Sequence, residues 1–460
     1  MNDFDLIVIG AGPVGENIAD YATRGGLRVA IVESELVGGE CSYWACMPSK
    51  ALLRSGQALR AARLVPGARE AVTAKLDASA VFARRDSFTS GWKDDGQVSW
   101  LESAGVTLIR GRGKLQSPGR VQVDGLTFSA TAVALATGSV PTMPDISGLA
   151  EAAPWGTREA AAAHHVPRRL VIFGGGVAGT EMAFAYSSLG SKVTLISRGA
   201  ILGKEEPFAG QYVSAALKEA GVNLLVGVSA TKVARDEHGN VHIDLDDGIQ
   251  LNAEELLVAT GRIPATYGLG LQALGVDSNL EVDDTMLVTG TDWLYAAGDV
   301  NGRALLTHQG KYQARVAGEA IAARHHGAAL ATDRWGRHAA TADHHAVPRV
   351  IFSDPEVAAV GLTEAQARAA GVNLRTVAYD IGHVAGASLH AQGYTGRAQL
   401  VIDQDRSVIV GATFVGQGVA ELLHSATIAI VGEVPLERLW HAVPAYPTIS
   451  EIWLRLLEAI

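Results

Sequence analysis

The only two cysteines in this 460-residue chain, Cys41 and Cys46, have four residues between them. At this spacing two thiols near one helical turn can approach each other and close a short-range disulfide. In a reducing compartment such a pair is more often redox-active or metal-binding than a structural cross-link. Zinc would need two further soft or imidazole ligands, and no histidine or third cysteine lies close in the sequence. The pair alone leaves redox chemistry and metal binding with distant histidines both open.

A pattern typical of dinucleotide binding precedes the cysteines. An apolar run at residues 6–9 is suited to a buried strand, and a G-x-G-x-x-G signature follows it. A helix expected to end near residue 24 comes next, and then a second strand whose last residue is an acid. The residues expected to bind the nucleotide are Gly10, Gly12, Pro13, Gly15 and Glu33. Glycines let the backbone approach a pyrophosphate at the helix N-terminus, and the acid can bind ribose hydroxyls. This ordered set predicts dinucleotide binding more specifically than glycines alone.

The same unit recurs after an apolar run at residues 170–173. Its signature glycines are Gly174, Gly176 and Gly179. Two such units predict two bound nucleotides, an arrangement suited to a flavin enzyme that takes hydride from a nicotinamide. The second unit ends in Ser197 and Arg198, where the first ends in an acid. An arginine there can pair with the 2′-phosphate of NADP, so the local sequence favours NADPH, with NADH as the alternative.

Three further strand ends carry turns that could contact a ligand. Two buried runs end in Ala-Thr-Gly and a third ends in Ala-Gly-Asp. The residues concerned are Thr137, Gly138, Gly261, Gly298 and Asp299. Glycine permits close approach of the backbone to a ligand, and the acid can accept a hydrogen bond from a ligand hydroxyl. Taken singly, each motif is also compatible with a purely structural turn.

Five histidines lie between residues 323 and 345, in a stretch rich in alanine and arginine. They are His325, His326, His338, His344 and His345. Because their spacing is not that of a regular ligand set, we expect a solvated connector rather than a metal site. We predict no bound metal.

Composition and charge restrict the class of protein further. A chain with 48% hydrophobic and 19% charged residues is typical of a globular protein, and its length suggests about three domains. A net charge of −10 argues against a nucleic-acid-binding surface. The sequence opens on a strand-like run instead of a leader, and no apolar run reaches membrane-spanning length. We therefore expect a cytoplasmic protein with neither nucleic acid nor membrane as a partner.

Together these motifs resemble the FAD-dependent pyridine nucleotide–disulfide oxidoreductases, a family that includes dihydrolipoamide dehydrogenase, glutathione reductase and mercuric reductase. The segment 38–50, of the form G-G-x-C-x4-C-x-P-S-K, is highly specific, and the resemblance covers essentially the whole chain. It implies an α/β fold with two Rossmann-like nucleotide-binding domains, a C-terminal α+β dimerisation domain, and a homodimer. The implied divisions are 1–145 and 265–340 for the two parts of the FAD-binding domain, 146–264 for the NAD(P)-binding domain, and 345–460 for the interface domain.

The resemblance also implies a chemistry. FAD takes hydride from NAD(P)H and reduces a disulfide formed by Cys41 and Cys46. Cys46 is then the flavin-proximal thiol and Cys41 the thiol that attacks the substrate. Gly39 is expected to contact the cofactor, and Lys50 and Glu181 match the pair that the family places beside the flavin. A cation there also stabilises the thiolate, which is the reactive form. The implied reaction is NADPH-dependent reduction of a small disulfide or related sulfur substrate.

One departure from the family concerns proton transfer. Disulfide-reducing members usually carry a His-Pro pair near the C-terminus, followed by Ser-Glu, and that histidine serves the substrate-attacking thiol across the dimer. Here Tyr446 takes the histidine position and Glu451 remains. Tyrosine, with an unperturbed pKa near roughly 10, is a poor base at neutral pH but can donate a proton. His441, upstream, is the alternative substitute.

The missing histidine keeps other functions open. One is an NAD(P)H reductase of quinones or other electron acceptors that react at the flavin. Another is a non-catalytic redox sensor that retains the fold. Mercuric reductases resemble this chain in carrying tyrosine at that position, but they also use a C-terminal cysteine pair that is absent from this sequence, so we do not expect mercury reduction.

A second departure is the bulky insert between the cysteines, residues 42–45. It contains Tyr43 and Trp44. These aromatic side chains either line the substrate pocket or pack into the core, and the sequence does not separate the two possibilities.

Overall fold

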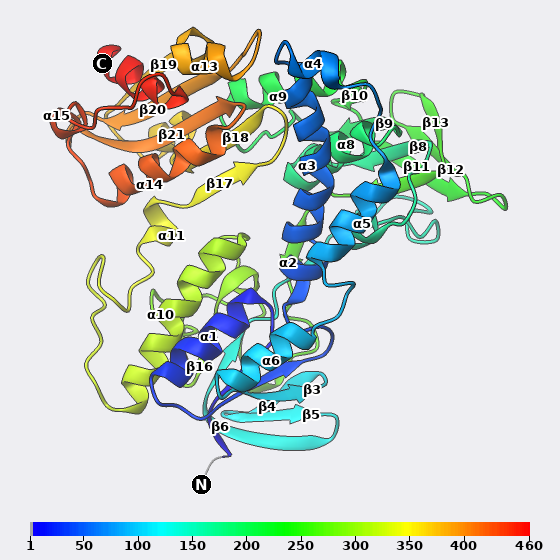
Figure 1. Cartoon of the computed structure of the whole chain (residues 1–460). Coiled ribbons are helices and arrows are strands. Elements are labelled where there is room, and N and C mark those ends of the chain that lie inside the picture. The colour runs from blue at the N-terminus through cyan, green and yellow to red at the C-terminus, as the bar shows by residue number, and fades with distance from the viewer. Residues whose placement is uncertain (1–2) are drawn as a thin grey trace. The chain divides into compact units, whose positions relative to one another are not determined.

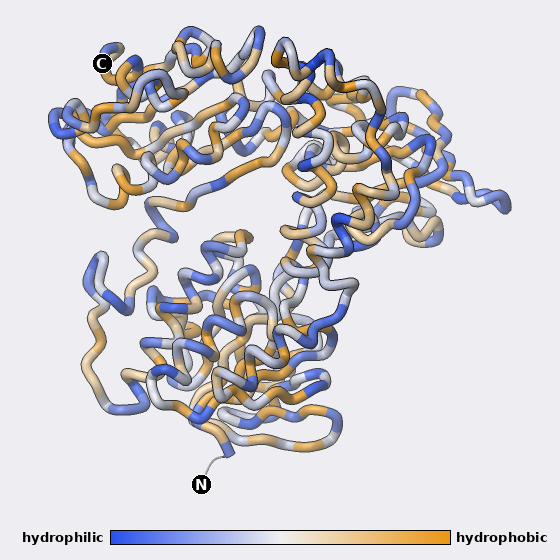
Figure 2. Tube along the Cα trace, viewed as in Figure 1, coloured by the Kyte–Doolittle hydropathy of each residue, from blue (hydrophilic) through white to orange (hydrophobic). Residues whose placement is uncertain are grey.

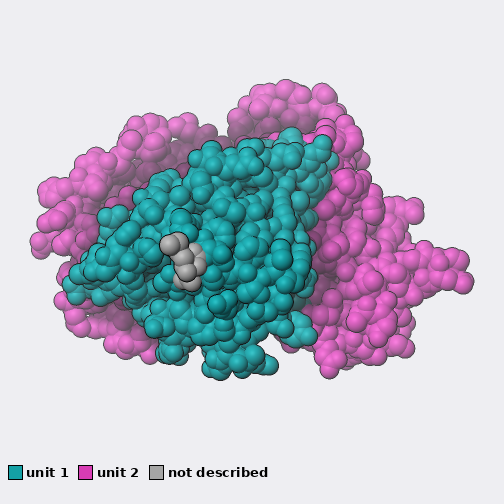
Figure 3. All heavy atoms as spheres, turned by 90° about the horizontal axis from the view of Figure 1, so that it is seen from below, with its two compact units in different colours: residues 1–48, 86–142, 262–344 teal, residues 49–85, 143–261, 345–460 magenta. Residues whose placement is uncertain are grey.

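The computed structural model describes residues 3–460, which form two compact units (Figure 3). Each unit is assembled from three separate stretches of the chain. Unit 1 comprises residues 3–48, 86–142 and 262–344, and unit 2 comprises residues 49–85, 143–261 and 345–460. The first boundary falls inside helix α3 (Cys46–Arg63). No helix within residues 3–460 is both long and apolar enough to cross a membrane.

A parallel sheet forms the centre of unit 1. Its strands, in spatial order, are β3 (Thr107–Arg110), β2 (Val29–Glu33), β1 (Phe4–Ile9), β6 (Leu126–Leu135) and β16 (Leu294–Ala296). The last four residues of β1 are buried, as expected for a parallel strand whose two faces are both covered. The first half of β6 also forms an antiparallel hairpin with β5 (Arg120–Val123), and β5 pairs with β4 (Gly113–Ser117).

Helices α1 (Pro13–Arg24) and α10 (Thr307–His325) of unit 1 pack side by side (Figure 1). A side chain at Gly318 of α10 would collide with the backbone of Ile18 and Ala22 in α1, so glycine permits this close approach. Because α10 continues to His325, the irregular connector is shorter than predicted, and a short helix, α11 (Ala342–His345), ends it. Apolar residues buried between these helices and the sheet form the core of unit 1.

Unit 2 contains a second parallel sheet. Its strands, in spatial order, are β10 (Asn223–Val226), β9 (Lys192–Ser197), β8 (Arg169–Phe173) and β14 (Glu255–Val258). Helix α8 (Val177–Ser188) follows β8, and α9 (Pro207–Glu219) leads to β10. Between β10 and β14 the chain forms an antiparallel sheet of β11 (Ala230–Arg235), β12 (Val241–Leu245) and β13 (Gln250–Ala253).

The C-terminal part of unit 2 is an antiparallel sheet with helices packed on it. Its strands, in spatial order, are β17 (Pro348–Ile351), β18 (Glu356–Gly361), β21 (Val408–Gly416), β20 (Arg397–Asp403) and β19 (Leu374–Asp380). Helices α14 (Leu423–Val431) and α16 (Ile452–Glu458) contact this sheet. Strands β20 and β21 form an antiparallel hairpin, and both carry hydrophobic residues along most of their length (Figure 2).

Short elements complete the fold. The remaining α-helices are α2 (Gly39–Tyr43), α4 (Ala68–Ala71), α5 (Ala78–Phe88), α6 (Asp95–Ser103), α7 (Thr157–Ala162), α12 (Glu364–Ala369), α13 (Ala385–His390) and α15 (Leu436–Leu439). Strands β7 (Ser139–Pro141) and β15 (Arg262–Pro264) pair antiparallel, and 3-10 turns span Gln272–Leu274, Gly298–Asn301, Ile381–His383, Val419–Leu422 and Ile449–Glu451. The architecture confirms the predicted α/β fold with two nucleotide-binding sheets and a C-terminal α+β region.

Candidate active site

The first glycine signature forms a tight turn between β1 and α1. Gly10 has a φ of +102°, and a side chain on it would collide with the carbonyl of Ala136. A side chain on Gly15 would collide in turn with the carbonyl of Gly10. A Cβ on Gly12, by contrast, would meet only the Gly39 Cα, at an ordinary contact distance of 4.0 Å, and Pro13 takes the first helical position, where its missing N–H is no loss. Gly10 and Gly15 are therefore packed against backbone carbonyls, whereas the turn at Gly12 leaves room for a phosphate to approach.

The segment that carries the cysteines packs onto this turn. The Gly38 N–H donates to the Ala11 carbonyl at 2.7 Å, and a side chain on Gly39 would lie 2.8 Å from the Cα of Gly12. The Ala11 N–H donates to the Glu33 carboxylate at 2.7 Å, so the acid that ends β2 lies beside the same turn. Unit 1 thus brings the predicted nucleotide-binding residues and the start of the cysteine motif together.

The two cysteines lie in consecutive helices, Cys41 in α2 and Cys46 at the start of α3. Both are partly buried, and both are thiols in this structure. The Sγ atom of Cys46 lies 3.3 Å from the Oγ1 atom of Thr307, the first residue of α10. Sequence reasoning missed Thr307 because it lies 261 positions from Cys46 and belongs to no motif.

The structure separates the two aromatic residues of the insert. Tyr43 is 1% exposed, its hydroxyl donates to the Lys93 carbonyl at 3.3 Å, and its own carbonyl accepts from the Trp92 indole N–H at 3.2 Å. Burial raises the pKa of Tyr43 to about 12. Trp44 is only partly buried, and its ring centroid lies 5.7 Å from that of Tyr43. Tyr43 therefore anchors α2 in the core.

Lys50 and Glu181 form an ion pair within unit 2, with a Nζ–Oε2 distance of 2.8 Å. The Glu181 side chain is only 3% exposed, and its other oxygen accepts the Phe352 backbone N–H at 3.0 Å. The Lys50 Nζ atom also lies 5.0 Å from the Phe352 ring centroid. A carboxylate this buried needs such partners. The pair is thus held in place by three segments that are distant in sequence: α3, α8 and the loop between β17 and β18.

The second glycine signature repeats the geometry of the first within unit 2. Gly174 has a φ of +115°, and a side chain on it would collide with the Ala259 carbonyl. A side chain on Gly179 would collide with the Gly174 carbonyl. Gly176 has open space, and Gly261, with a φ of +143°, ends the Ala-Thr-Gly motif beside this turn. The two glycine turns therefore share a first glycine at positive φ and a last glycine packed against the carbonyl of the first.

The strand that ends beside this second turn leads into exposed cations. Arg198 directly follows β9 and is exposed, and Lys204 is exposed six residues later. The guanidinium of Arg198 has no ion-pair or hydrogen-bond partner in the described part of the chain. It is therefore available to an anionic ligand.

The Ala-Gly-Asp motif of unit 1 is tied to the first Ala-Thr-Gly motif. The Asp299 carboxylate accepts from the Ser139 hydroxyl at 2.6 Å, and Arg262 donates to that hydroxyl at 2.7 Å. Burial raises the pKa of Asp299 above its usual range, while the Ser139 bond opposes the shift. The Thr137 hydroxyl donates to the Ala265 carbonyl at 2.8 Å, and Gly138, with open space on its Cβ side, follows it.

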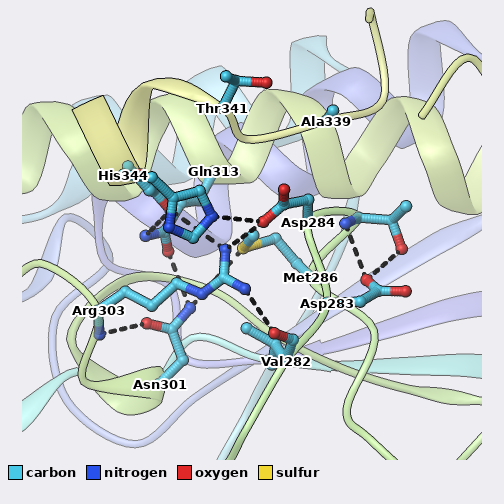
Figure 4. Close-up of polar contacts among 12 residues, drawn as sticks. Val282, Asp283, Asp284, Met286, Asn301, Arg303, Gln313, Ala339, Thr341 and His344 are labelled. Carbon is cyan, nitrogen blue, oxygen red and sulfur yellow. Dashed lines mark hydrogen bonds and ion pairs between the residues drawn. The ribbon is translucent and has the colours of Figure 1, made fainter. Parts of the chain in front are cut away.

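A buried polar network holds the turn that carries Gly298. The Gln313 side-chain oxygen accepts from the Gly298 N–H at 2.7 Å and from the Asn301 amide at 3.0 Å, and its amide donates to Asp343 at 2.8 Å. Arg303 donates to Asp284 at 2.9 Å (Figure 4). Sequence reasoning missed this network because its members share no local pattern.

Four of the five histidines of the connector are exposed, as expected for a solvated stretch, but three of the five have hydrogen-bond partners. His344 lies 2.8 Å from the Asp284 carboxylate in the same network (Figure 4). His326 lies 2.9 Å from the Gly25 carbonyl, and His338 accepts the Ala331 N–H at 2.9 Å. His344 and His326 therefore tie the connector to the rest of unit 1, whereas the His338 bond lies within the connector. Among residues 3–460, no group of three or more His, Cys, Asp or Glu is arranged to hold a metal ion.

The C-terminal candidates lie in unit 2. The Tyr446 side chain is exposed at 76%, and His441 is also exposed. Glu451 is 9% exposed; one of its oxygens accepts from Arg455 at 2.7 Å, and the other is buried without a hydrogen-bond partner in the described chain. Tyr446 and Glu451 are therefore in contrasting environments. The described residues place no base next to the Tyr446 hydroxyl.

Comparisons with known proteins identify the family. Residues 4–327 match the family described as "Pyridine nucleotide-disulphide oxidoreductase", and residues 347–456 match its dimerisation domain. The chain is 30% identical to a mercuric reductase of Staphylococcus aureus over 98% of its own length and 81% of the relative. It is 32% identical to a dihydrolipoyl dehydrogenase of Thermus scotoductus (100% and 98%) and 30% identical to a glutathione reductase of Burkholderia cepacia (99% and 98%).

A solved structure shows the same fold. The HOCl-induced flavoprotein disulfide reductase RclA from Escherichia coli superposes with a TM-score of 0.84 at 22% identity, over 99% of this chain and 100% of that one. The expected family and fold are confirmed by these matches. The chain belongs to the pyridine nucleotide-disulphide oxidoreductases, flavoprotein oxidoreductases with FAD and a pyridine nucleotide as typical cofactors, and its redox-active pair is Cys41 and Cys46.

Proposed function

We propose that this protein is an NADPH-dependent FAD disulfide reductase that acts on a small disulfide or related sulfur substrate. The observation that carries the proposal is the position of the cysteine segment: Gly38 and Gly39 pack it directly onto the nucleotide-binding turn at Gly12. That contact gives a dithiol a place next to a bound dinucleotide. Bound FAD supplies hydride acceptance from NADPH and electron transfer to the Cys41–Cys46 disulfide.

We assign the two thiols different roles. Cys46 begins α3, where the positive end of the helix dipole favours an anion, and its Sγ atom has the Thr307 hydroxyl beside it. Cys46 is therefore the flavin-proximal thiol. Cys41, in the preceding helix, attacks the substrate disulfide, forms a mixed disulfide with one half and releases the other half as a thiol. Cys46 then attacks the Cys41 sulfur, which releases the second substrate thiol and re-forms the Cys41–Cys46 disulfide.

Lys50 and Glu181 are proposed as the pair beside the flavin. The ion pair, with a Nζ–Oε2 distance of 2.8 Å, holds the Lys50 ammonium in place, and the Phe352 N–H fixes the orientation of the carboxylate. A fixed cation there favours both a reduced cofactor and a thiolate. The contacts to FAD are assigned to Gly10, Gly12, Pro13, Gly15, Glu33, Gly39, Thr137, Gly138, Gly298 and Asp299.

NADPH is assigned to the second glycine turn. Gly174, Gly176, Gly179 and Gly261 form its backbone cradle. Arg198, which is exposed and has no partner in the described chain, is proposed to pair with the 2′-phosphate. Replacing Arg198 with glutamate should raise KM for NADPH and leave KM for NADH unchanged or lower; equal effects on both nucleotides would remove Arg198 from this role.

Proton transfer is assigned to Tyr446 in a homodimer. The exposed Tyr446 hydroxyl can donate a proton to the thiolate that leaves the substrate at the other subunit. The buried Glu451 lies five residues further along the chain. His441 is the alternative donor. We also propose the domain divisions 1–145 with 265–340, 146–264, and 345–460.

The deciding experiment is an anaerobic titration of the FAD-loaded protein with NADPH, repeated with NADH and followed by visible absorbance. Long-wavelength thiolate–flavin absorbance after the first reducing equivalents, without full bleaching, supports a working cysteine pair. Immediate bleaching of the flavin means that the disulfide is bypassed and overturns the proposal.

A second candidate function is the reduction of quinones or other electron acceptors. The presence of Tyr446 in place of the family's histidine favours this candidate. The double variant Cys41→Ser, Cys46→Ser separates the two functions. Unchanged NADPH-dependent quinone reduction by this variant, with no disulfide turnover by the parent protein, would establish the second candidate.

A further inference from the structure

A cavity of about 310 Å³ lies in unit 2, outside the residues assigned to either nucleotide. Helices α3 and α8, the end of α9 and the segment 352–354 form its wall. Its apolar lining consists of Leu53, Leu59, Leu76, Phe184, Ala220 and Phe352. Small-molecule pockets have volumes of roughly 300–1,000 Å³, so this one accommodates a molecule of one or two rings.

Two arginines from α3 give the cavity an excess of positive charge. The Arg60 Nε atom lies 3.2 Å from an Asp354 oxygen, and a terminal nitrogen of Arg60 lies 3.6 Å from Glu219. Arg63 lines the same cavity, one turn further along the helix. Its guanidinium has no ion-pair or hydrogen-bond partner anywhere within residues 3–460. Arg60 is thus neutralised by the protein, and Arg63 is left to pair with an anion.

Phe352 connects this cavity to the Lys50–Glu181 pair. Phe352 lines the cavity, and its ring centroid lies 5.0 Å from the Lys50 ammonium. Its N–H holds the Glu181 carboxylate, and its carbonyl accepts from Gln57, another cavity residue, at 3.1 Å. A molecule packed against Phe352 therefore contacts the residue that positions the ion pair.

We propose that the cavity is a regulatory site for a small carboxylate with an apolar body, and that its occupant acts on Lys50 and Glu181 through Phe352. The apolar walls bury the body of the ligand, and Arg63 pairs with its carboxylate. The binding itself does not depend on the proposed function. The effect on turnover does, because it rests on the proposed place of Lys50 beside the flavin.

The test is calorimetric titration of the FAD-loaded protein, saturated with NADP⁺, with naphthalene-2-carboxylate. We expect one site per chain, and about tenfold weaker binding of naphthalene-2-carboxamide, which has the same shape without the charge. Arg63→Gln should weaken carboxylate binding to the same extent, whereas Arg112→Gln, an exposed arginine of unit 1, should leave it unchanged. Ala220→Trp, at an exposed position of the lining, should block the site, and the exposed control Ala369→Trp should not.

Absence of binding, equal affinity for carboxylate and carboxamide, or unchanged binding by both Arg63→Gln and Ala220→Trp would overturn the site. For regulation, saturating carboxylate should change the rate of flavin reduction by NADPH about fivefold in the parent protein and not in Arg63→Gln. Binding without any such change in rate would overturn the regulatory role, but the cavity would still be established as a binding site. A protein that binds the carboxylate but turns over no disulfide would instead contradict the proposed function.

Discussion

Glu16, on the first turn of α1, has the most perturbed carboxyl group near the first glycine turn. Burial raises its pKa from an ordinary value of 4.5 to about 7, with the nearby Glu33 adding to the shift and Lys311 opposing it. One of its oxygens is buried with no hydrogen-bond partner in the described chain. The folded protein therefore binds a proton here more tightly than the unfolded chain does, and the ionised carboxylate destabilises the fold.

Glu16→Gln should stabilise the FAD-free protein at high pH only. Below pH 4.5 both folded and unfolded states are protonated, so the variant and parent should unfold alike; as pH rises through 7 the parent loses about 3 kcal/mol that the variant keeps. Urea unfolding at several pH values between 4 and 8.5 measures the difference. Glu281→Gln, an exposed acid of the same unit, serves as control. A difference between Glu16→Gln and parent that does not vary with pH would contradict this account.

Gly39 supports a prediction at the contact between the cysteine segment and the glycine turn. Its φ is +56°, and an added Cβ would lie 2.8 Å from the Gly12 Cα, so Gly39→Ala should push the two backbones apart. We expect FAD affinity to fall about tenfold or more, measured by quenching of FAD fluorescence on reconstitution. Gly91→Ala is a matched control, because Gly91 has a φ of +61° with nothing near its Cβ position. Equal losses in both variants would mean that backbone strain alone is responsible.

Among the elements, α10 joins the parts of unit 1. Its first residue, Thr307, lies beside Cys46, its middle holds Gly298 through Gln313, and its length packs on α1. The contact of Gln313 with Asp343 also ties the connector to the helix. Movement of α10 should therefore affect the dithiol and the Ala-Gly-Asp turn together.

Gln313→Glu tests this coupling, because a second carboxylate would replace the amide that donates to the buried Asp343. Repulsion should loosen the Gly298 turn and weaken FAD binding about tenfold, as measured by FAD reconstitution. Adding Asp343→Asn supplies a donor to the new carboxylate and should recover most of the affinity, and the double-mutant cycle gives the coupling. Additive effects of the two changes would show that the two residues do not act through each other.

At the scale of the whole molecule, the parts predicted from sequence are those with local signals. Both glycine turns and the strands and helices around them follow from patterns shorter than about 30 residues, because the phosphate cradle is built by consecutive backbone. The match between Lys50 and Glu181 came from resemblance, and the structure brings these residues into contact.

The rest of the site depends on contacts between distant residues of common types. Ser139 and Asp299 are 160 positions apart, and nothing around Ser139 distinguishes it from other serines. The buried state of Glu16 and the orientation of Tyr43 depend on packing that no periodicity reveals. The connector histidines are exposed as expected, but their spacing does not reveal their partners, the Asp284 carboxylate and the Gly25 carbonyl, which only the fold brings near.

Assembly is the last property that belongs to the whole molecule. The segment before Glu451 exposes Trp440 at 47%, Val443 at 85% and Tyr446 at 76%, within the region that matches the dimerisation domain. Large apolar side chains that are this exposed in one short segment are typical of an interface. In the proposed homodimer they are buried against the other subunit, where Tyr446 meets the substrate.

Val443→Glu should therefore weaken the dimer about tenfold or more, because it buries a charge in place of an apolar side chain. Sedimentation at decreasing protein concentration measures the shift, with Leu126→Glu, another exposed apolar site at 66% but outside the dimerisation domain, as control. If Tyr446 acts across the interface, disulfide turnover should fall with the dimer fraction while NADPH still reduces the flavin at the parent rate. Loss of dimer with full disulfide turnover would place proton transfer within a single chain and remove Tyr446 from it.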